Sequence, residues 1–169
     1  MKIKKIFKNQ KGFTIIEVAL VLAIGALIFL VVFLAVPALQ RNQRNDAKKR
    51  DVSNVVEAIA SYISNNPSGS LGAVGTVVYR DNKGVSGATF GDYLDTLSNN
   101  TETVSIASRV QDIAGSSGNN NSGKIFVIPG QRCQSTSGGG LSKATNRQAA
   151  VVAVIETANG HVHYCSSAN

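Results

Sequence analysis

The amino-acid sequence predicts an α+β protein in which one long N-terminal α-helix packs against a small antiparallel β-sheet. Three observations support this fold class. An uninterrupted apolar run extends from Val18 to Val36, and the segment after it has apolar residues at helical spacing. Several short segments rich in β-branched residues then follow in the last third of the chain, each bounded by turn residues.

The positive charge of the chain is concentrated before the apolar run. The 169 residues have a formal net charge of +7, but five of the lysines lie among the first 12 residues. Without those 12 residues the chain has 12 basic and 10 acidic residues, a net charge of +2. The charge is therefore typical of a short targeting segment, and it gives little support to a nucleic-acid-binding body.

The apolar run is predicted to be a retained membrane anchor. About 20 residues of α-helix span roughly 30 Å, the thickness of a bilayer core. No small-residue cleavage site follows the run, as it would in a secretory signal. The basic residues on its two sides are equal in number, so they do not orient it. The cysteine pair near the C-terminus favours an external C-terminal domain and a cytoplasmic N-terminus.

Glu17 interrupts the apolar pattern four positions after Phe13. A carboxylate in a membrane helix is unfavourable unless it reaches water or a cation, and such residues are frequently functional. Two interpretations follow from this residue alone. Either Glu17 is an interfacial side chain that points back to water, or it pairs with a positive charge during assembly.

The residues around Glu17 resemble the cleavage and assembly signal of type IV pilins and pseudopilins. The string is Lys11-Gly12-Phe13-Thr14-Ile15-Ile16-Glu17-Val18, followed by the apolar run. The resemblance covers roughly residues 5–65. It implies the pilin fold, cleavage by a prepilin peptidase between Gly12 and Phe13, and N-methylation of the new N-terminus at Phe13.

The resemblance also implies roles for three residues within the helix. Glu17 would lie beside the N-terminal amine of a neighbouring subunit and fix the register between helices. The stretch between Gly25 and Pro37 would unwind in the assembled filament, and Pro37 by itself is expected to kink or open the helix because it removes a hydrogen bond. Pro37 lies about one turn further from the cleavage site than in familiar members of the family.

The helix is expected to continue beyond Pro37 and to end at Asn65-Asn66-Pro67. Its second half has one apolar face, formed by Val52, Val55, Val56, Ile59 and Ile63. Asp46, Asp51 and Glu57 are expected on other faces, with the basic cluster at residues 41–50. We interpret this cluster as a solvated surface that pairs with acids of neighbouring subunits. Binding of DNA along a filament is an alternative.

The C-terminal part is predicted to form a head of short strands. The region 68–123 contains a candidate strand at 76–79, candidate helices at 90–97 and 104–113, and a Gly/Ser/Asn-rich loop at 115–123. Strand signals follow at 124–128, 148–156 and 161–165, and an Asn-Gly pair at 159–160 predicts a hairpin. We expect a three- or four-stranded antiparallel sheet against the amphipathic half of the helix.

Cys133 and Cys165 are predicted to form one disulfide, which would contribute about 3–4 kcal/mol in the chain-entropy model. Such a bond resembles the C-terminal disulfide loop of many pilins. An alternative is a zinc site that combines both cysteines with His161 and His163. The two histidines are otherwise expected to be exposed, opposite an inward Val162 and Tyr164. We predict no metal, no cofactor and no enzymatic activity, because no catalytic motif is present.

These expectations divide the chain into a leader at 1–12, an assembly helix at 13–39, an amphipathic stem at 40–66 and a head at 67–169. The predicted function is that of a structural subunit, the major pilin of a type IV pilus used for adhesion, motility or DNA uptake. Its expected partners are copies of itself, the prepilin peptidase, the pilus assembly machinery and the cytoplasmic membrane, before it reaches the cell surface. The alternatives are a pseudopilin of a secretion or competence system and a minor pilin that binds DNA or a receptor.

Overall fold

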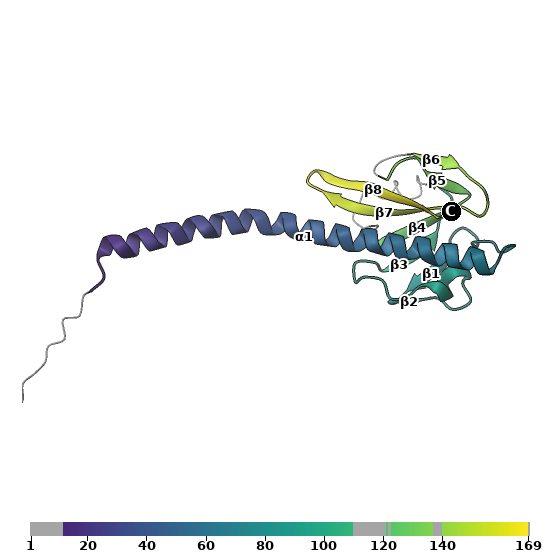
Figure 1. The fold of residues 1–169 in the computed structure, drawn as a ribbon, viewed down its shortest axis with the longest axis horizontal. Coiled ribbons are helices and arrows are strands. Elements are labelled where there is room, and N and C mark those ends of the chain that lie inside the picture. Colours follow the sequence, from purple (N-terminus) through teal and green to yellow (C-terminus); the bar gives the residue numbers. More distant parts are fainter. Residues whose placement is uncertain (1–11, 110–120, 122, 137–139, 169) are drawn as a thin grey trace, which may run out of the picture. The chain divides into compact units, whose positions relative to one another are not determined.

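The computed structural model describes residues 12–109, 121, 123–136 and 140–168, which divide into two compact units (Figure 1). The first unit extends to Gln40 and the second begins at Arg41. Helix α1 (Ile15–Asn65) runs through this boundary. It ends where the sequence predicts, because Pro67 has no N–H to continue the helical hydrogen bonds.

The second unit contains a six-stranded sheet. Its strands are β1 (Val77–Arg80), β2 (Lys83–Gly84), β3 (Thr103–Ile106), β4 (Lys124–Pro129), β7 (Ala149–Thr157) and β8 (Gly160–Ala168). They lie in the order β2-β1-β3-β4-β7-β8. All neighbouring pairs are antiparallel except β3 and β4, which are parallel. The sheet is therefore mixed and larger than expected. The 17 residues between β3 and β4 give the chain enough length to return for a parallel pairing.

Three shorter elements complete the second unit. Strands β5 (Gln131–Cys133) and β6 (Leu141–Lys143) form a separate two-stranded sheet, and η1 (Thr89–Tyr93) is a single 3₁₀ segment. The helix expected at 90–97 is thus limited to this segment. The helix expected at 104–113 is wrong in its described part, because residues 103–106 form a strand in which alternate side chains are buried. Most of the loop expected at 115–123 lies outside the described residues.

Two apolar clusters cover the two faces of the sheet. Val52, Val55, Ile59 and Ile63 of α1 pack with inward residues of β1, β3, β4 and β7, as their helical spacing predicts. On the other face, Ile128, Val152 and Cys165 pack with partly buried residues of β5 and β6. Because both faces of β7 are covered, its first five residues are all buried, which explains its continuous apolar sequence.

The hairpin between β7 and β8 is the longest pairing in the sheet. Its register runs from Ala149 opposite Ala168 to Thr157 opposite Gly160, leaving a two-residue loop at 158–159. Gly160 has φ of 136°, a conformation that glycine adopts without a steric penalty. The Asn-Gly signal therefore predicts the hairpin correctly, and the returning strand extends three residues beyond the expected 161–165.

Candidate functional site

The predicted cleavage junction lies in an exposed segment before the helix. Gly12 and Phe13 are in neither helix nor strand, and α1 begins two residues later. Phe13 is 85% exposed, and no atom comes within 4 Å of a Cβ built on Gly12. The peptide bond between them is thus sterically open to a protease. The structure of the uncut chain does not test cleavage or methylation, so both stay predictions.

Thr14 and Glu17 form the N-terminal cap of α1. The backbone N–H of Glu17 donates to Thr14 Oγ1 at 3.3 Å, and the Thr14 hydroxyl donates to Glu17 Oε2 at 3.4 Å. A threonine followed three residues later by glutamate is the capping-box pattern, which satisfies helix N–H groups that have no intrahelical acceptor. The negative carboxylate is also favourable near the positive end of the helix dipole. Thr14 therefore orients Glu17, a role that its sequence position alone could have indicated.

Glu17 is the single charged residue between positions 12 and 40. Its side chain is exposed and helps to line a shallow surface hollow with Phe13, Val18, Val21 and Leu22. A carboxylate among apolar groups is poorly solvated when those groups become covered, so a cation of matching size would then be strongly attracted. The Glu17 carboxylate can receive a positive group, but no positively charged side chain among the described residues pairs with it.

Gly25 and Pro37 do not interrupt α1 in the single chain, which is helical through both positions. No atom lies within 4 Å of a Cβ built on Gly25, so packing within this chain does not require a glycine there. The unwinding expected between these residues concerns the assembled filament and stays a prediction.

The first half of α1 is long and apolar enough to cross a membrane. Its most apolar 18-residue window has a mean hydropathy of 3.2, and none of that window is buried within the chain. Nearly every large apolar side chain from Phe13 to Leu39 is about half exposed or more. These side chains need a cover that the single chain does not supply, either lipid or other protein.

The basic cluster at 41–50 differs from its prediction, because four of its members, Arg44, Lys48, Lys49 and Arg50, have partners within the chain. Arg44 forms a two-pronged ion pair with Glu156 of β7, with Nε–Oε1 at 3.0 Å and Nη2–Oε2 at 2.6 Å. The hydrogen bonds from Arg44 are the main cause that lowers the pKa of Glu156. The pair remains partly exposed, so its net contribution to stability is small.

Asn45 continues the hydrogen bonding of β7 beyond the first residues of β4. Its side-chain amide donates to the Glu156 carbonyl at 2.7 Å and accepts from the Glu156 N–H at 2.9 Å. Strand β4 pairs with β7 only as far as Ala153. Asn45 thus satisfies both backbone groups of a residue on the open edge of β7, in place of a neighbouring strand.

Lys48 and Asp51 were expected on a solvated face, and this prediction is wrong. They are only 4% and 3% exposed. The Asp51 carboxylate accepts hydrogen bonds from the Ser98 N–H at 2.9 Å and from the hydroxyls of Ser98 and Thr101, both at 2.5 Å. We call these residues and Lys48 the buried polar cluster. Polar side chains here are buried because the segment 98–101 folds over the helix and supplies their partners.

The Lys48 ammonium completes this buried polar cluster. It donates to the backbone carbonyl of Asn100 and, at 3.4 Å, to Thr101 Oγ1. Burial lowers the pKa of Lys48 to about 8, although Asp51 and Glu102 act in the opposite direction. Sequence reasoning missed this cluster because charged residues between Arg41 and Arg50 resemble a solvated helix face.

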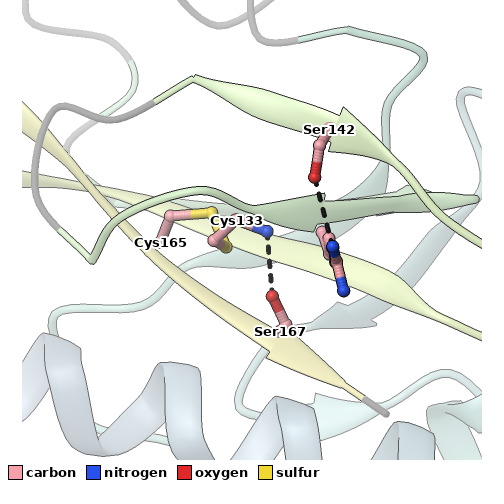
Figure 2. Close-up of a disulfide and its surroundings, with 5 residues drawn as sticks. Cys133, Ser142, Cys165 and Ser167 are labelled. Carbon is pink, nitrogen blue, oxygen red and sulfur yellow. Dashed lines mark hydrogen bonds between the residues drawn. A yellow bond between two sulfur atoms is a disulfide. The ribbon is translucent and has the colours of Figure 1, made fainter.

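The structure contains the Cys133–Cys165 disulfide (Figure 2). It joins β5 to β8, and the Cys133 N–H donates to Ser167 Oγ at 2.9 Å beside it. Because the two sulfur atoms are bonded to each other, they are not available as zinc ligands with His161 and His163. No cluster of three or more metal-ligating side chains occurs in the part of the chain that the structure describes. His161 is exposed and Tyr164 packs on the core, as the alternation predicts, whereas His163 and Val162 are both half-buried.

A family model described as the prokaryotic N-terminal methylation motif matches residues 7–33. The match contains the Gly12–Phe13 junction, Thr14, Glu17 and Gly25. A search of curated proteins and a search of solved structures each returned no match.

Proposed function

We propose that this chain, which carries the N-terminal signature of type IV pilins and prepilins, is the major structural subunit of a type IV pilus. The methylation motif supports a type IV pilin-like or pseudopilin-type protein, and pilin-type proteins are structural subunits. In our proposal, a prepilin peptidase removes residues 1–12 and Phe13 becomes the N-methylated N-terminus. Residues 13–39 then self-associate while the head remains outside.

The observation that carries the proposal is the isolated carboxylate of Glu17 beside Phe13. After cleavage, the Phe13 amine keeps its positive charge when methylated. In an apolar filament interior, attraction between this amine and a neighbouring Glu17 is stronger than in water. The pair need not stabilise the filament more than a hydrophobic contact would, but it sets the axial register of otherwise smooth apolar helices.

The exposed apolar surface of residues 13–39 supports assembly. In the membrane these side chains contact lipid, which is about as apolar as leucine. Once the subunit leaves the membrane, water would surround them, and each large side chain left exposed would cost about 1.5–3 kcal/mol. Neighbouring copies of the same helix supply the replacement cover. This supports a subunit that begins as a single-pass cytoplasmic membrane protein with an internal N-terminus and ends in a surface filament.

The nearest rival is a pseudopilin that forms a short filament within the cell envelope. The Gly/Ser/Asn-rich segment 115–123 favours a surface filament, where a hydrophilic exterior is an advantage, whereas the disulfide between β5 and β8 fits both rivals, because the periplasm is oxidising too. Sheared surface filaments distinguish the two. A dominant band of this chain supports the major pilin, whereas its absence from the surface fraction supports the pseudopilin.

The test compares the natural chain with Glu17→Gln, which preserves the size of the side chain and removes its charge. We expect both forms to be cleaved and inserted in the membrane, but only the natural chain to yield abundant filaments. Leu22→Val, a change in the same surface hollow without loss of charge, is the matched control and should assemble. Intact mass and the N-terminal residue of the sheared material are measured. Recovery with Met1 attached, or normal filament yield from Glu17→Gln, would contradict the proposal.

A further inference from the structure

The first turns of α1 after the predicted membrane anchor are strongly basic. Residues 41–50 contain five lysines and arginines and one acidic residue, Asp46. Arg41 is the second residue after Leu39, where the predicted anchor ends. Because equally many basic residues precede the anchor, the cluster does not orient it, and membrane orientation does not account for its position.

The tip of the β7–β8 hairpin is attached to these turns of the helix. The Arg44 guanidinium binds the Glu156 carboxylate, and the Asn45 side chain binds both backbone groups of the same residue. Figure 1 shows the hairpin beside α1. Asn45 follows Leu39 by six residues, a path of about 9 Å along an α-helix. The hairpin tip is therefore tethered close to the point where the predicted anchor ends.

Positive charge exceeds negative charge around Glu156. The hydrogen bonds from Arg44 are the main cause that lowers the pKa of Glu156, and the charges of His161 and Arg41 act in the same direction. His161 lies directly opposite Glu156 in the register of β7 and β8. We call these four residues the proximal cluster. Arg44 is neutralised by Glu156, whereas Arg41 has no ion pair among the described residues, so Arg41 supplies the net charge of the cluster.

The hairpin also has free backbone donors beside the proximal cluster. Strand β8 ends the sheet order, so one of its edges has no neighbouring strand. The Cys165 N–H points to that edge, because it donates to the Thr136 carbonyl at 3.0 Å. The N–H groups of His163 and His161, two and four residues earlier, point the same way by the alternation of an antiparallel pair. No acceptor for these two groups occurs in the described part of the chain.

We propose that the proximal cluster binds the phosphate of an anionic lipid headgroup while the subunit is anchored in the membrane. Guanidinium groups and free N–H groups are good donors to phosphate oxygens. The headgroup region extends about 5–8 Å beyond the hydrocarbon core on each side, so Arg41 reaches it directly from the end of the anchor. This inference rests on the anchored stage of the proposed function and specifies which lipid group the head contacts.

The anchor decides between lipid and nucleic acid as the source of the phosphate. Insertion holds the proximal cluster beside the headgroups at a high effective concentration, whereas nucleic acid has to arrive from solution. One arginine near an anionic bilayer contributes about a fivefold gain in binding. The contact thus follows from insertion, and it is lost when the subunit leaves the membrane.

The experiment measures hydrogen exchange of the hairpin in the full chain reconstituted into vesicles. One set of vesicles contains phosphatidylcholine alone, and the other contains equal parts of phosphatidylcholine and phosphatidylglycerol. We expect the His161 and His163 amides to exchange about fivefold more slowly in the anionic vesicles. Salt at about 1 M, which shortens the screening length to about 3 Å, should remove this difference.

Arg41→Gln is the test variant, because it removes the net charge of the proximal cluster and leaves the contacts of Arg44 and Asn45 with Glu156 in place. We expect it to lose most of the slowing. Arg50→Gln is the matched control: it removes the same charge from an exposed position about 14 Å further along the helix, and it should keep the slowing. Unchanged exchange in residues 149–153 of β7, which are buried, shows that both variants are folded.

Equal exchange in the two kinds of vesicle, or full slowing in Arg41→Gln, overturns the inference. Slowing that disappears when the protein is diluted in the same lipid also overturns it, in favour of a contact between copies. The same holds if inorganic phosphate or a short DNA duplex slows the hairpin equally well in neutral vesicles, because the ligand is then not the membrane. Extraction of the natural chain from the vesicles by alkaline carbonate would instead contradict the anchored stage of the proposed function, and the inference with it.

Discussion

In residues 15–40 of α1 the large apolar side chains are exposed, whereas in residues 41–65 one apolar face is covered by the sheet. The two halves belong to one helix, yet they differ in where their apolar cover and hydrogen-bond partners come from. The second half receives its apolar cover and its hydrogen-bond partners from the same chain. The first half has only its cap at Thr14 and Glu17, and depends on lipid or other copies. One continuous helix thus combines a half whose apolar face is buried by its own chain with a half whose apolar surface needs lipid or other subunits.

The largest expected effect comes from removing a partner in the completed half. Asp51→Ala removes the larger of the two carboxylate attractions on the buried Lys48 ammonium and takes the acceptor from Ser98 and Thr101. We expect the free energy of unfolding of the head to fall by about 3–5 kcal/mol. Urea unfolding of the full chain in detergent, followed by tyrosine near-ultraviolet circular dichroism, measures it. Asp46→Ala is the control, because Asp46 is exposed and its ion pair with Lys49 is weak. Equal midpoints for the two variants would contradict the assignment.

A matched pair of isoleucines sharpens the comparison between the halves. Ile59 is fully buried, whereas Ile28 is 59% exposed in the same helix. Ile59→Ala should destabilise the head by about 2–5 kcal/mol through lost burial and the cavity that remains. Ile28→Ala should leave the same unfolding transition unchanged, since no head residue loses a contact. A comparable shift in both variants would show that the first half also takes part in the folded core.

A smaller effect is expected from the pH dependence of Lys48. Its pKa is about 8 in the folded head and near 10.5 in the unfolded chain. Between these values the unfolded state holds more protons, so this residue makes the head more stable as pH rises and less stable as pH falls through 8. The difference is on the order of 1–3 kcal/mol across this window.

Lys48→Met provides the comparison, because it removes the titrating group and keeps an apolar stem of similar length. Unfolding free energies from pH 7 to pH 10 should rise more steeply for the natural chain than for the variant. Parallel curves would mean that Lys48 stays charged throughout this range in the folded head.

The elements with strong local signals could be predicted from sequence. The end of α1 follows from Pro67, the apolar face of its second half from the spacing of four buried residues, and the β7–β8 hairpin from Asn159-Gly160. Each of these depends on a few neighbouring residues. The Cys133–Cys165 disulfide was also predictable, because the chain contains only two cysteines.

The features that depend on distant segments could not be predicted in the same way. Strand β3 was expected to be helical, because its pairing with β1 and β4 is not encoded within residues 103–106. The burial of Lys48 and Asp51 depends on residues 98–101, about 50 positions away, which fold over the helix. In the candidate site, Glu17 was identified from its charge within the apolar run, whereas the role of Thr14 was missed although its place three residues before Glu17 fits the capping-box pattern.

The disulfide has a mechanical consequence for the end of the chain. Strand β8 lies at the edge of the sheet, and an edge strand is the first to peel away when its free end is pulled. Cys165 fixes this strand covalently to β5, so peeling from the C-terminus stops there after three paired residues have separated. Tension applied at the C-terminus then passes through a covalent bond to the strands inside the head. Fraying from the C-terminus is therefore limited to residues 166–168, of which Ala168 belongs to the apolar core.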